Sequence, residues 1–157
     1  MSIRNSAKAV ILHEGKILLN HCVTAEGIEY YDLPGGGQHQ FESMEEAIVR
    51  EVQEETGYTV QVKRFLALAE EIEQDHMLRE QYPDYTHRIV HFFLAELTGK
   101  SRPDPSEKDF QMLESIWIPL DQADRLSFRP PQLTGRITAL IHGEISPFLG
   151  TVLVKTD

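Results

Sequence analysis

Cysteine is nearly absent from this chain, which has one cysteine, Cys22, among its 157 residues. A lone cysteine cannot form an intramolecular disulfide, and it cannot build a cysteine cluster that holds zinc. Long apolar runs are missing too, because no segment approaches the roughly 20 residues needed to cross a bilayer. These absences favour a protein of the reducing cytoplasm without membrane association. Since Cys22 lies in an apolar run, we interpret it as a buried, unreactive thiol.

Basic residues are also few, with 15 Lys and Arg against 25 Asp and Glu, which gives a net charge of −10. Such a charge argues against the broad basic surface on which most nucleic-acid binders depend. Phosphate substrates remain compatible with it, because a bound divalent cation inverts the local charge. The acids are concentrated: six glutamates between Glu42 and Glu55 stand against one basic residue, Arg50.

The length suits a single domain, which we expect to span residues 1–157. Apolar alternation and turn residues predict strands at residues 7–13, 17–23, 28–33, 58–70, 85–97 and 113–119. Helices are predicted at residues 43–56 and 131–142, and loops at residues 71–83 and 98–112. Two main helices among several strands indicate an α/β or α+β sandwich, with the helices packed on a mixed sheet.

The predicted helix 43–56 has acids where its apolar face should continue. Two turns of this face are apolar, and the next turn of the same face carries Glu51, Glu54 and Glu55. Three ionised carboxylates so close repel one another and lose hydration near a core, whereas Mg²⁺ prefers oxygen ligands. The alternative is a frayed last turn with exposed acids. Arg50 can pair with Glu46 or Glu54 at four-residue spacing.

Gly35, Gly36 and Gly37 follow Pro34 directly before this helix. Glycines let the backbone approach a ligand closely, and a glycine loop that leads into a helix can bind phosphate through its N–H groups. A plain turn is the alternative interpretation. The GK[ST] ending of a Walker P-loop is absent.

Together these residues resemble the Nudix box, G-x5-E-x7-R-E-U-x-E-E-x-G-U, in which U is a bulky aliphatic residue. Every fixed position is filled at the right spacing, and Tyr58 at the last U position is the one departure. The preceding segment, residues 31–37, is similar to the family's aromatic-x-L-P-G-G segment. The matching residues are Gly36, Glu42, Arg50, Glu51, Val52, Glu54, Glu55 and Gly57.

The resemblance implies an α/β/α sandwich that hydrolyses a nucleoside diphosphate linked to another moiety. It implies that Glu51, Glu54 and Glu55 bind Mg²⁺ or Mn²⁺, and that Arg50 orients a glutamate. Glu42 would stabilise the junction of loop and helix or join the metal shell through water. Gly36 and Gly57 would serve backbone geometry.

For catalysis we expect Glu54, Glu51 and Arg50 to act together, with Glu54 as the first candidate for the base that takes a proton from water. In some members of the family the base lies on a later loop, so Glu107 or Asp109 is the alternative. Candidate substrate contacts are Gly35, Gly37, Tyr31 and Arg88.

The group attached to the diphosphate, a homodimer, and the roles of His39, His87 and His91 stay open at this stage. A hydrolase that removes oxidised nucleoside triphosphates is a second hypothesis, and a non-catalytic nucleotide-sensing module of the same fold is a third. An acidic interaction domain would explain neither the glycines nor the spacing. The intact set of Arg50, Glu51, Glu54 and Glu55 favours an enzyme over a sensor.

Overall fold

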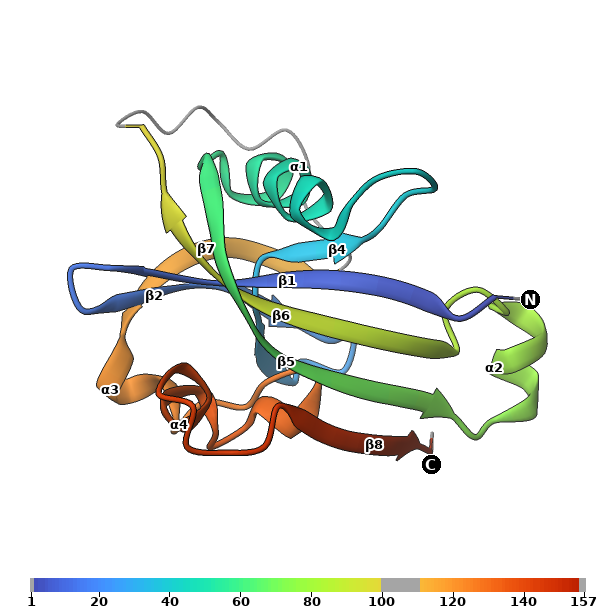
Figure 1. Cartoon of the computed structure of the whole chain (residues 1–157). Coiled ribbons are helices and arrows are strands. Elements are labelled where there is room, and N and C mark those ends of the chain that lie inside the picture. The colour runs from blue at the N-terminus through green and yellow to red at the C-terminus, as the bar shows by residue number, and fades with distance from the viewer. Residues whose placement is uncertain (1, 100–110, 156–157) are drawn as a thin grey trace.

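The computed structural model describes residues 2–99 and 111–155, and in them a curved mixed sheet carries helices on both faces (Figure 1). The predicted sandwich with a mixed sheet is confirmed. The strands are β1 (Arg4–His13), β2 (Lys16–Val23), β3 (Glu29–Asp32), β4 (Gly35–Gly37), β5 (Val60–Glu73), β6 (His87–Leu97), β7 (Met112–Pro119) and β8 (Phe148–Val154). The helices are α1 (Met44–Thr56), α2 (His76–Gln81), α3 (Leu120–Ala123) and α4 (Ile137–Ile141), with a 3₁₀ turn at Pro131–Leu133.

The sheet mixes parallel and antiparallel pairs. Its strand order is β3-β2-β1-β6-β5-β8, while β4 pairs with β1 and β7 pairs with β2. β1 runs parallel to β6, and β5 runs parallel to β8, whereas β1–β2 and β5–β6 are antiparallel. β1 therefore has two partners on one edge: its first half pairs with the short strand β4, and its end forms a hairpin with β2.

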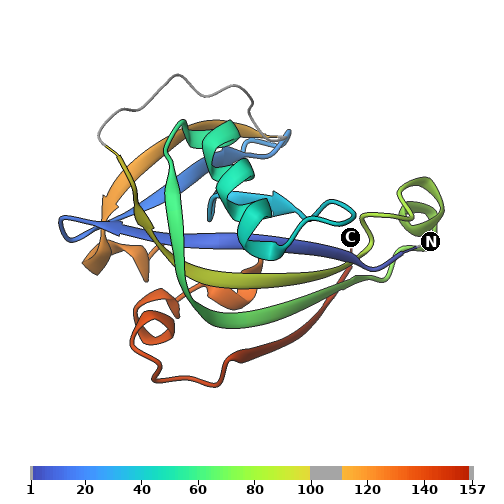
Figure 2. The ribbon, with the colours of Figure 1, turned by 45° about the horizontal axis from the view of Figure 1, so that its top comes forward.

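Alternation along β1 separates two hydrophobic cores. Ala7, Ala9 and Ile11 point to the face that α1 covers, where they pack with buried residues of that helix. Val10 points to the other face, where it packs with buried side chains of α3 and α4. Figure 1 and Figure 2 show the same division, with α1 on one side of the sheet and α4 on the other.

Local capping explains where α1 begins and ends. Ser43 is the N-cap and forms a capping box, in which its side chain accepts from the Glu46 backbone and the Glu46 side chain accepts from the Ser43 backbone. Gly57 ends the helix in the left-handed conformation, with φ of 75°. The predicted helix and its stop at Gly57 are confirmed. Cys22 is buried, as predicted.

The glycine segment differs from its prediction. We expected a loop or a turn there, yet Gly35–Gly37 forms β4, an antiparallel partner of β1 with Ser6 opposite Gly37 and Lys8 opposite Gly35. A segment without side chains can lie flat beside another strand, so the glycines make close pairing possible here.

Other predicted boundaries were also wrong. Residues 71–83, read as a loop, contain the end of β5 and the helix α2, because Asp75 caps α2 by accepting from two backbone N–H groups. The predicted helix 131–142 is divided into a 3₁₀ turn and α4, since Gly135 between them has φ of 74°. The short helix α3 and the strand β8 were not predicted.

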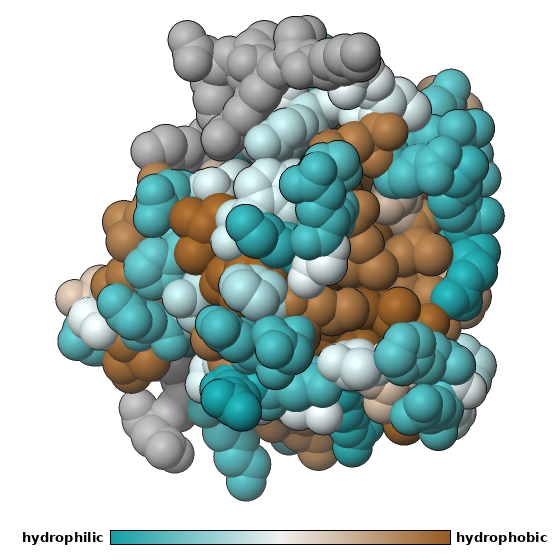
Figure 3. Space-filling model, turned by 90° about the vertical axis from the view of Figure 1, so that its left-hand side faces the viewer, coloured by the Kyte–Doolittle hydropathy of each residue, from teal (hydrophilic) through white to brown (hydrophobic). Residues whose placement is uncertain are grey.

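Apolar side chains gather on the side of the molecule where the β1–β2 turn lies, as the brown area in Figure 3 shows. Among the exposed apolar residues is Phe65 of β5, which is 47% exposed and meets the ring of Phe93 edge-on at 5.5 Å. No helix in residues 2–99 and 111–155 has the length and apolar character of a membrane span.

Candidate active site

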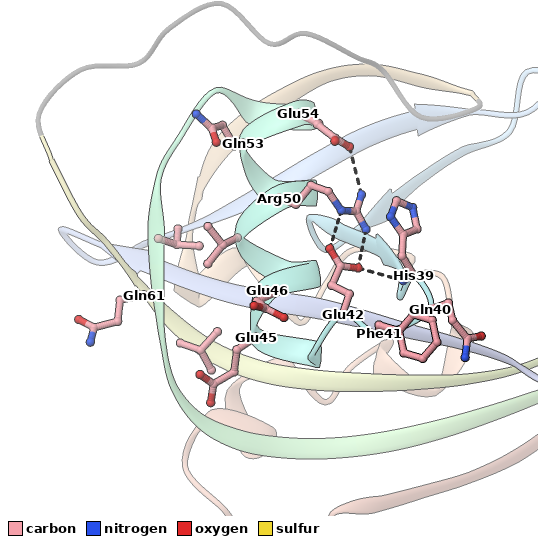
Figure 4. Close-up of a pocket in the computed structure, with 13 residues that line it drawn as sticks. His39, Gln40, Phe41, Glu42, Glu45, Glu46, Arg50, Gln53, Glu54 and Gln61 are labelled. Atoms are coloured by element: carbon pink, nitrogen blue, oxygen red, sulfur yellow. Dashed lines mark hydrogen bonds and ion pairs between the residues drawn. The ribbon is translucent and has the colours of Figure 1, made fainter.

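Arg50 is the centre of a charged network on α1 (Figure 4). Its Nε and Nη2 atoms donate to both oxygens of Glu42, at 2.7 and 3.0 Å. Its Nη1 atom donates to Glu51 Oε1 at 2.8 Å and to Glu54 Oε2 at 3.4 Å. Nη2 also donates to the Gly37 carbonyl oxygen at 3.0 Å. One guanidinium thus ties the helix to β4 and holds three carboxylates, which suits the planar, multiply donating geometry of arginine.

The two pairings predicted for Arg50 have different outcomes. The pair with Glu54 is present, although it is the longest contact of the network. The pair with Glu46 is absent, because the Glu46 carboxylate caps the start of α1 instead. Glu42, which sequence spacing alone did not connect to Arg50, is its bidentate partner.

Glu42 lies where the loop after β4 turns into α1. Its Oε2 atom accepts from the His39 backbone N–H at 2.9 Å, in addition to the bonds from Arg50. The hydrogen bonds from Arg50 lower the pKa of Glu42 to about 2, so this carboxylate stays ionised across the physiological range. Its position is that of a group that fastens the loop to the helix.

Gly36 makes room for Glu51. A Cβ atom added at Gly36 would lie 2.5 Å from Glu51 Cδ and 2.6 Å from Oε2, far inside normal contact distance. The Glu51 carboxylate therefore lies directly against the backbone of β4, between Gly36 and the Arg50 guanidinium. A glycine is needed here for close approach.

Glu55 is placed differently from the other two acids of the box. It is 3% exposed, and its Oε2 atom accepts from Asn20 Nδ2 at 2.8 Å and from the Gly35 backbone N–H at 3.1 Å. Burial raises the pKa of Glu55 to about 8, a rise that the nearby Lys8 charge partly opposes. Glu55 thus continues the buried face of α1, as the helical spacing predicted.

The raised pKa of Glu55 predicts a pH-dependent stability for the metal-free protein. The folded state keeps a proton that the unfolded state releases above its usual pKa of 4.5, so stability should fall as pH rises from about 4.5 through about 8. Glu55→Gln should remove this fall, because the amide stays neutral and its oxygen can still accept. Urea unfolding in EDTA at several pH values measures the effect.

We expect Glu55→Gln to stabilise the protein relative to wild type at pH 9 and to change little at pH 5. Glu26→Gln, at an exposed acid, is the control and should show no such difference between the two pH values. An equal gap between Glu55→Gln and wild type at both pH values would show that folding does not raise the pKa of Glu55.

The three acids fit a divalent cation in their donor chemistry. Each has one oxygen held by the protein, Oε1 in Glu51 and Oε2 in Glu54 and Glu55. Among the described residues, the other oxygen of each accepts no hydrogen bond, so each acid retains a hard donor of the kind Mg²⁺ prefers. No group of three His, Cys, Asp or Glu in residues 2–99 and 111–155 is already gathered closely enough to hold a metal. Mutual repulsion opposes such a gathering without a cation.

A cavity of about 840 Å³ opens on the other side of β4 from α1. Gly36 and Gly37 lie in its wall, so it reaches the backbone on which the Glu51 carboxylate rests. Asn20, which holds Glu55, also lines it. The cavity is therefore adjacent to the acids of α1 and large enough for a small-molecule ligand.

Two of the predicted substrate contacts line this cavity and two do not. Gly37 and Arg88 are in its wall, whereas Gly35 is buried against β1. Tyr31 points away and stacks on His21 at 5.1 Å, while its neighbour Tyr30 lines the cavity. Adjacent strand residues face opposite sides, and either face of this strand is compatible with the sequence pattern.

A second, wider cavity of about 1080 Å³ lies along the outer side of α1, where Figure 4 shows Glu42, Arg50 and Glu54. Phe41 stands at its edge, 98% exposed and with φ of 66°. The Arg50 network is thus reachable from this side as well. Glu107 and Asp109, the alternative bases, lie outside the described residues.

The histidines have contacts within the protein. His87 Nε2 lies 2.8 Å from Glu70 Oε1, and His91 Nδ1 lies 3.2 Å from the Ser6 carbonyl oxygen. His39 is exposed and reaches the network through its backbone N–H.

Comparison with known proteins adds a family and a fold. A family model described as NUDIX domain matches residues 3–136, most of the chain. A search of curated proteins found no match. Among solved structures, a NUDIX hydrolase from Nitrosomonas europaea is similar with a TM-score of 0.69 and 20% identity, over 91% of this chain and 90% of that one.

Two further structures show the same likeness. An ADP-ribose pyrophosphatase from Streptococcus suis has a TM-score of 0.60 and 23% identity, over 99% of this chain and 100% of that chain. A MutT protein from Methanosarcina mazei has a TM-score of 0.60 and 20% identity, over 92% and 96%. At these identities the likeness establishes the fold and leaves the substrate open.

Proposed function

This chain belongs to the Nudix family, whose hydrolases act on pyrophosphate bonds, and we propose that it hydrolyses the diphosphate bond of a nucleoside diphosphate linked to another moiety. The proposed cofactor is Mg²⁺ or Mn²⁺, and the proposed ligands are Glu51, Glu54 and Glu55. The observation that carries the proposal is the Arg50 network, which holds Glu51 against the glycine strand that borders one cavity and holds Glu54 in the wall of the other.

Each residue of the network has a separate task in this proposal. Arg50 holds one oxygen of Glu51 and one of Glu54, so the second oxygen of each faces away from the guanidinium. Glu42 anchors Arg50 from the loop and, being ionised, balances its charge. β4 presents backbone without side chains, which lets a diphosphate approach the helix closely.

A divalent cation, when bound, neutralises the negative diphosphate and makes a water more acidic. Glu54 then takes a proton from the attacking water. The water oxygen forms a bond to phosphorus as the bond from phosphorus to the bridging oxygen breaks, and the leaving phosphate keeps the electron pair. Glu54 suits this task because it is the most exposed of the three acids, 30% at the side chain against 17% for Glu51. Its proton can therefore pass to solvent afterwards.

The proposal is tested by assaying ADP-ribose, a nucleotide sugar, a dinucleoside polyphosphate and an oxidised nucleoside triphosphate, with chromatographic detection of both products. We expect turnover of at least one with Mg²⁺, no turnover in EDTA, and recovery when Mg²⁺ is returned. Turnover of the oxidised triphosphate alone would identify the sanitising hydrolase. No turnover of any, with tight binding of one, would replace the enzyme by a sensing module.

A further inference from the structure

The 840 Å³ cavity is basic although the chain as a whole has a net charge of −10. Its basic lining residues outnumber its acidic ones by four to three. The basic residues are Arg4, Lys8, Arg88 and Arg129, and the acidic residues are Asp32, Glu71 and Glu73. This excess of one basic residue runs against the acidic excess of the whole chain, so the pocket favours an anion more than the rest of the molecule does.

Partners within the protein neutralise only half of these cations. Lys8 Nζ lies 2.8 Å from Asp32 Oδ2, and Arg88 is paired with Glu71. Arg4 and Arg129 have no ion pair among residues 2–99 and 111–155. Their guanidinium donors are therefore available to a ligand, and both belong to the wall of the same cavity.

Each of these two arginines is instead placed over a tyrosine ring of the cavity. The Arg4 Cζ atom lies 4.7 Å from the centre of the Tyr85 ring, and the Arg129 Cζ atom lies 4.1 Å from the centre of the Tyr30 ring. A contact of this kind is an attraction between the cation and the ring, and it uses no N–H donor of the guanidinium. The N–H groups therefore remain available to bind an oxyanion bidentately.

Arg4 has a second support in the glycine strand. A Cβ atom added at Gly37 would lie 2.3 Å from Arg4 Nη2 and 2.6 Å from Cζ, so the guanidinium rests in the space that the missing side chain leaves. The next residue along β4, Gly36, makes the equivalent space for Glu51. Gly37 therefore makes space for a guanidinium group, and Gly36 makes space for a carboxylate that is a proposed metal ligand.

We propose that Arg4 and Arg129 bind phosphate oxygens of the substrate in this cavity, with Tyr85, Tyr30 and Gly37 as the residues that position the two guanidinium groups. The inference rests on the proposed function for the identity of the substrate. Binding of an oxyanion in the cavity can be measured even if the substrate is not known. Neither arginine belongs to the box, so the pair is a feature of this chain's own cavity.

Kinetics provide the first test, on whichever compound the wild type turns over. We expect Arg4→Gln and Arg129→Gln each to raise KM about tenfold or more and to change kcat much less, because each removes a charge-assisted contact. Arg136→Gln, at an exposed arginine away from the cavity, is the matched control and should leave KM unchanged.

Gly37→Ala provides a second test that keeps the arginine. The added methyl group should push the flexible Arg4 guanidinium away and raise KM as Arg4→Gln does. In the double variant, KM should match that of Arg4→Gln alone, since both changes remove one contact. Additive effects would mean that Gly37 acts through something other than Arg4.

Direct binding separates this inference from the proposed function. Titration calorimetry with inorganic pyrophosphate in EDTA should show binding that Arg4→Gln and Arg129→Gln each weaken, whether or not the protein is an enzyme. Unchanged pyrophosphate affinity and unchanged KM in both variants would overturn the inference. Loss of turnover in the compound panel, with arginine-dependent pyrophosphate binding intact, would overturn the proposed function alone.

Discussion

Replacement of Glu54 by glutamine is expected to lower kcat by about 100-fold or more, the usual contribution of a positioned general base. Glutamine keeps the size of the side chain and an oxygen that can accept from Arg50 Nη1, so the fold should be preserved. It cannot take a proton from water, and it binds a cation less well than a carboxylate does. Steady-state kinetics at concentrations of Mg²⁺ and substrate that saturate the wild type, with urea unfolding alongside, measure both properties.

The control for this experiment is Glu45→Gln, an exposed acid on the first turn of the same helix with the same change of charge. It should retain wild-type kcat. If Glu54→Gln is fully active, Glu54 is not the base. If its low kcat is restored by a higher Mg²⁺ concentration, Glu54 serves as a metal ligand only.

Replacement of Gly35 by alanine is expected to destabilise the protein by at least about 3 kcal/mol, the scale of a strained backbone combined with a core clash. Gly35 has φ of 134°, which an L-residue rarely adopts, and an added Cβ would lie 2.2 Å from the Ala7 carbonyl oxygen. The neighbouring Lys8 Cα would be 2.8 Å away. Both atoms belong to the backbone of β1 at the centre of the sheet, so neither can move aside cheaply. The expected fall in Tm is about 6 °C or more.

Gly27→Ala separates the clash from the conformational strain. Gly27 also has a positive φ, 83°, but an added Cβ there would meet nothing within 4 Å. Its alanine variant should therefore lose only about 1 kcal/mol, the cost of the left-handed conformation itself. If the two alanine variants melt at the same temperature, the close pairing of β4 with β1 is not what demands glycine at position 35.

The parts of the site that could be predicted from the sequence are those whose geometry is local. Residues on one helix have fixed angular relations, so spacing predicted that Glu51, Glu54 and Glu55 continue the apolar face of the helix, and Glu55 is buried there. The helix end at Gly57 follows from a single residue's conformational freedom. The predicted fold class was confirmed for a related reason, since alternation along each strand is also a local pattern.

The parts that could not be predicted depend on contacts between distant segments. Nothing in the sequence near Glu55 indicates that Asn20, 35 residues away, donates to its carboxylate. Nor does spacing show that Arg129 covers the ring of Tyr30, which is what distinguishes this tyrosine from Tyr31. The predicted helix 131–142 was too long because apolar periodicity continued across Gly135, where the backbone turns.

The three residues of β4 are all glycine, yet saturation mutagenesis should give a different phenotype at each position. Any larger residue at Gly35 meets backbone, so its variants should be missing from the soluble fraction. At Gly36 the obstacle is the Glu51 carboxylate, and variants should be soluble but slow. At Gly37 the obstacle is the Arg4 guanidinium, and variants should turn over at high substrate concentration only. Substitutions at Gly35, Gly36 and Gly37 would thus change soluble abundance, turnover rate and substrate affinity, respectively.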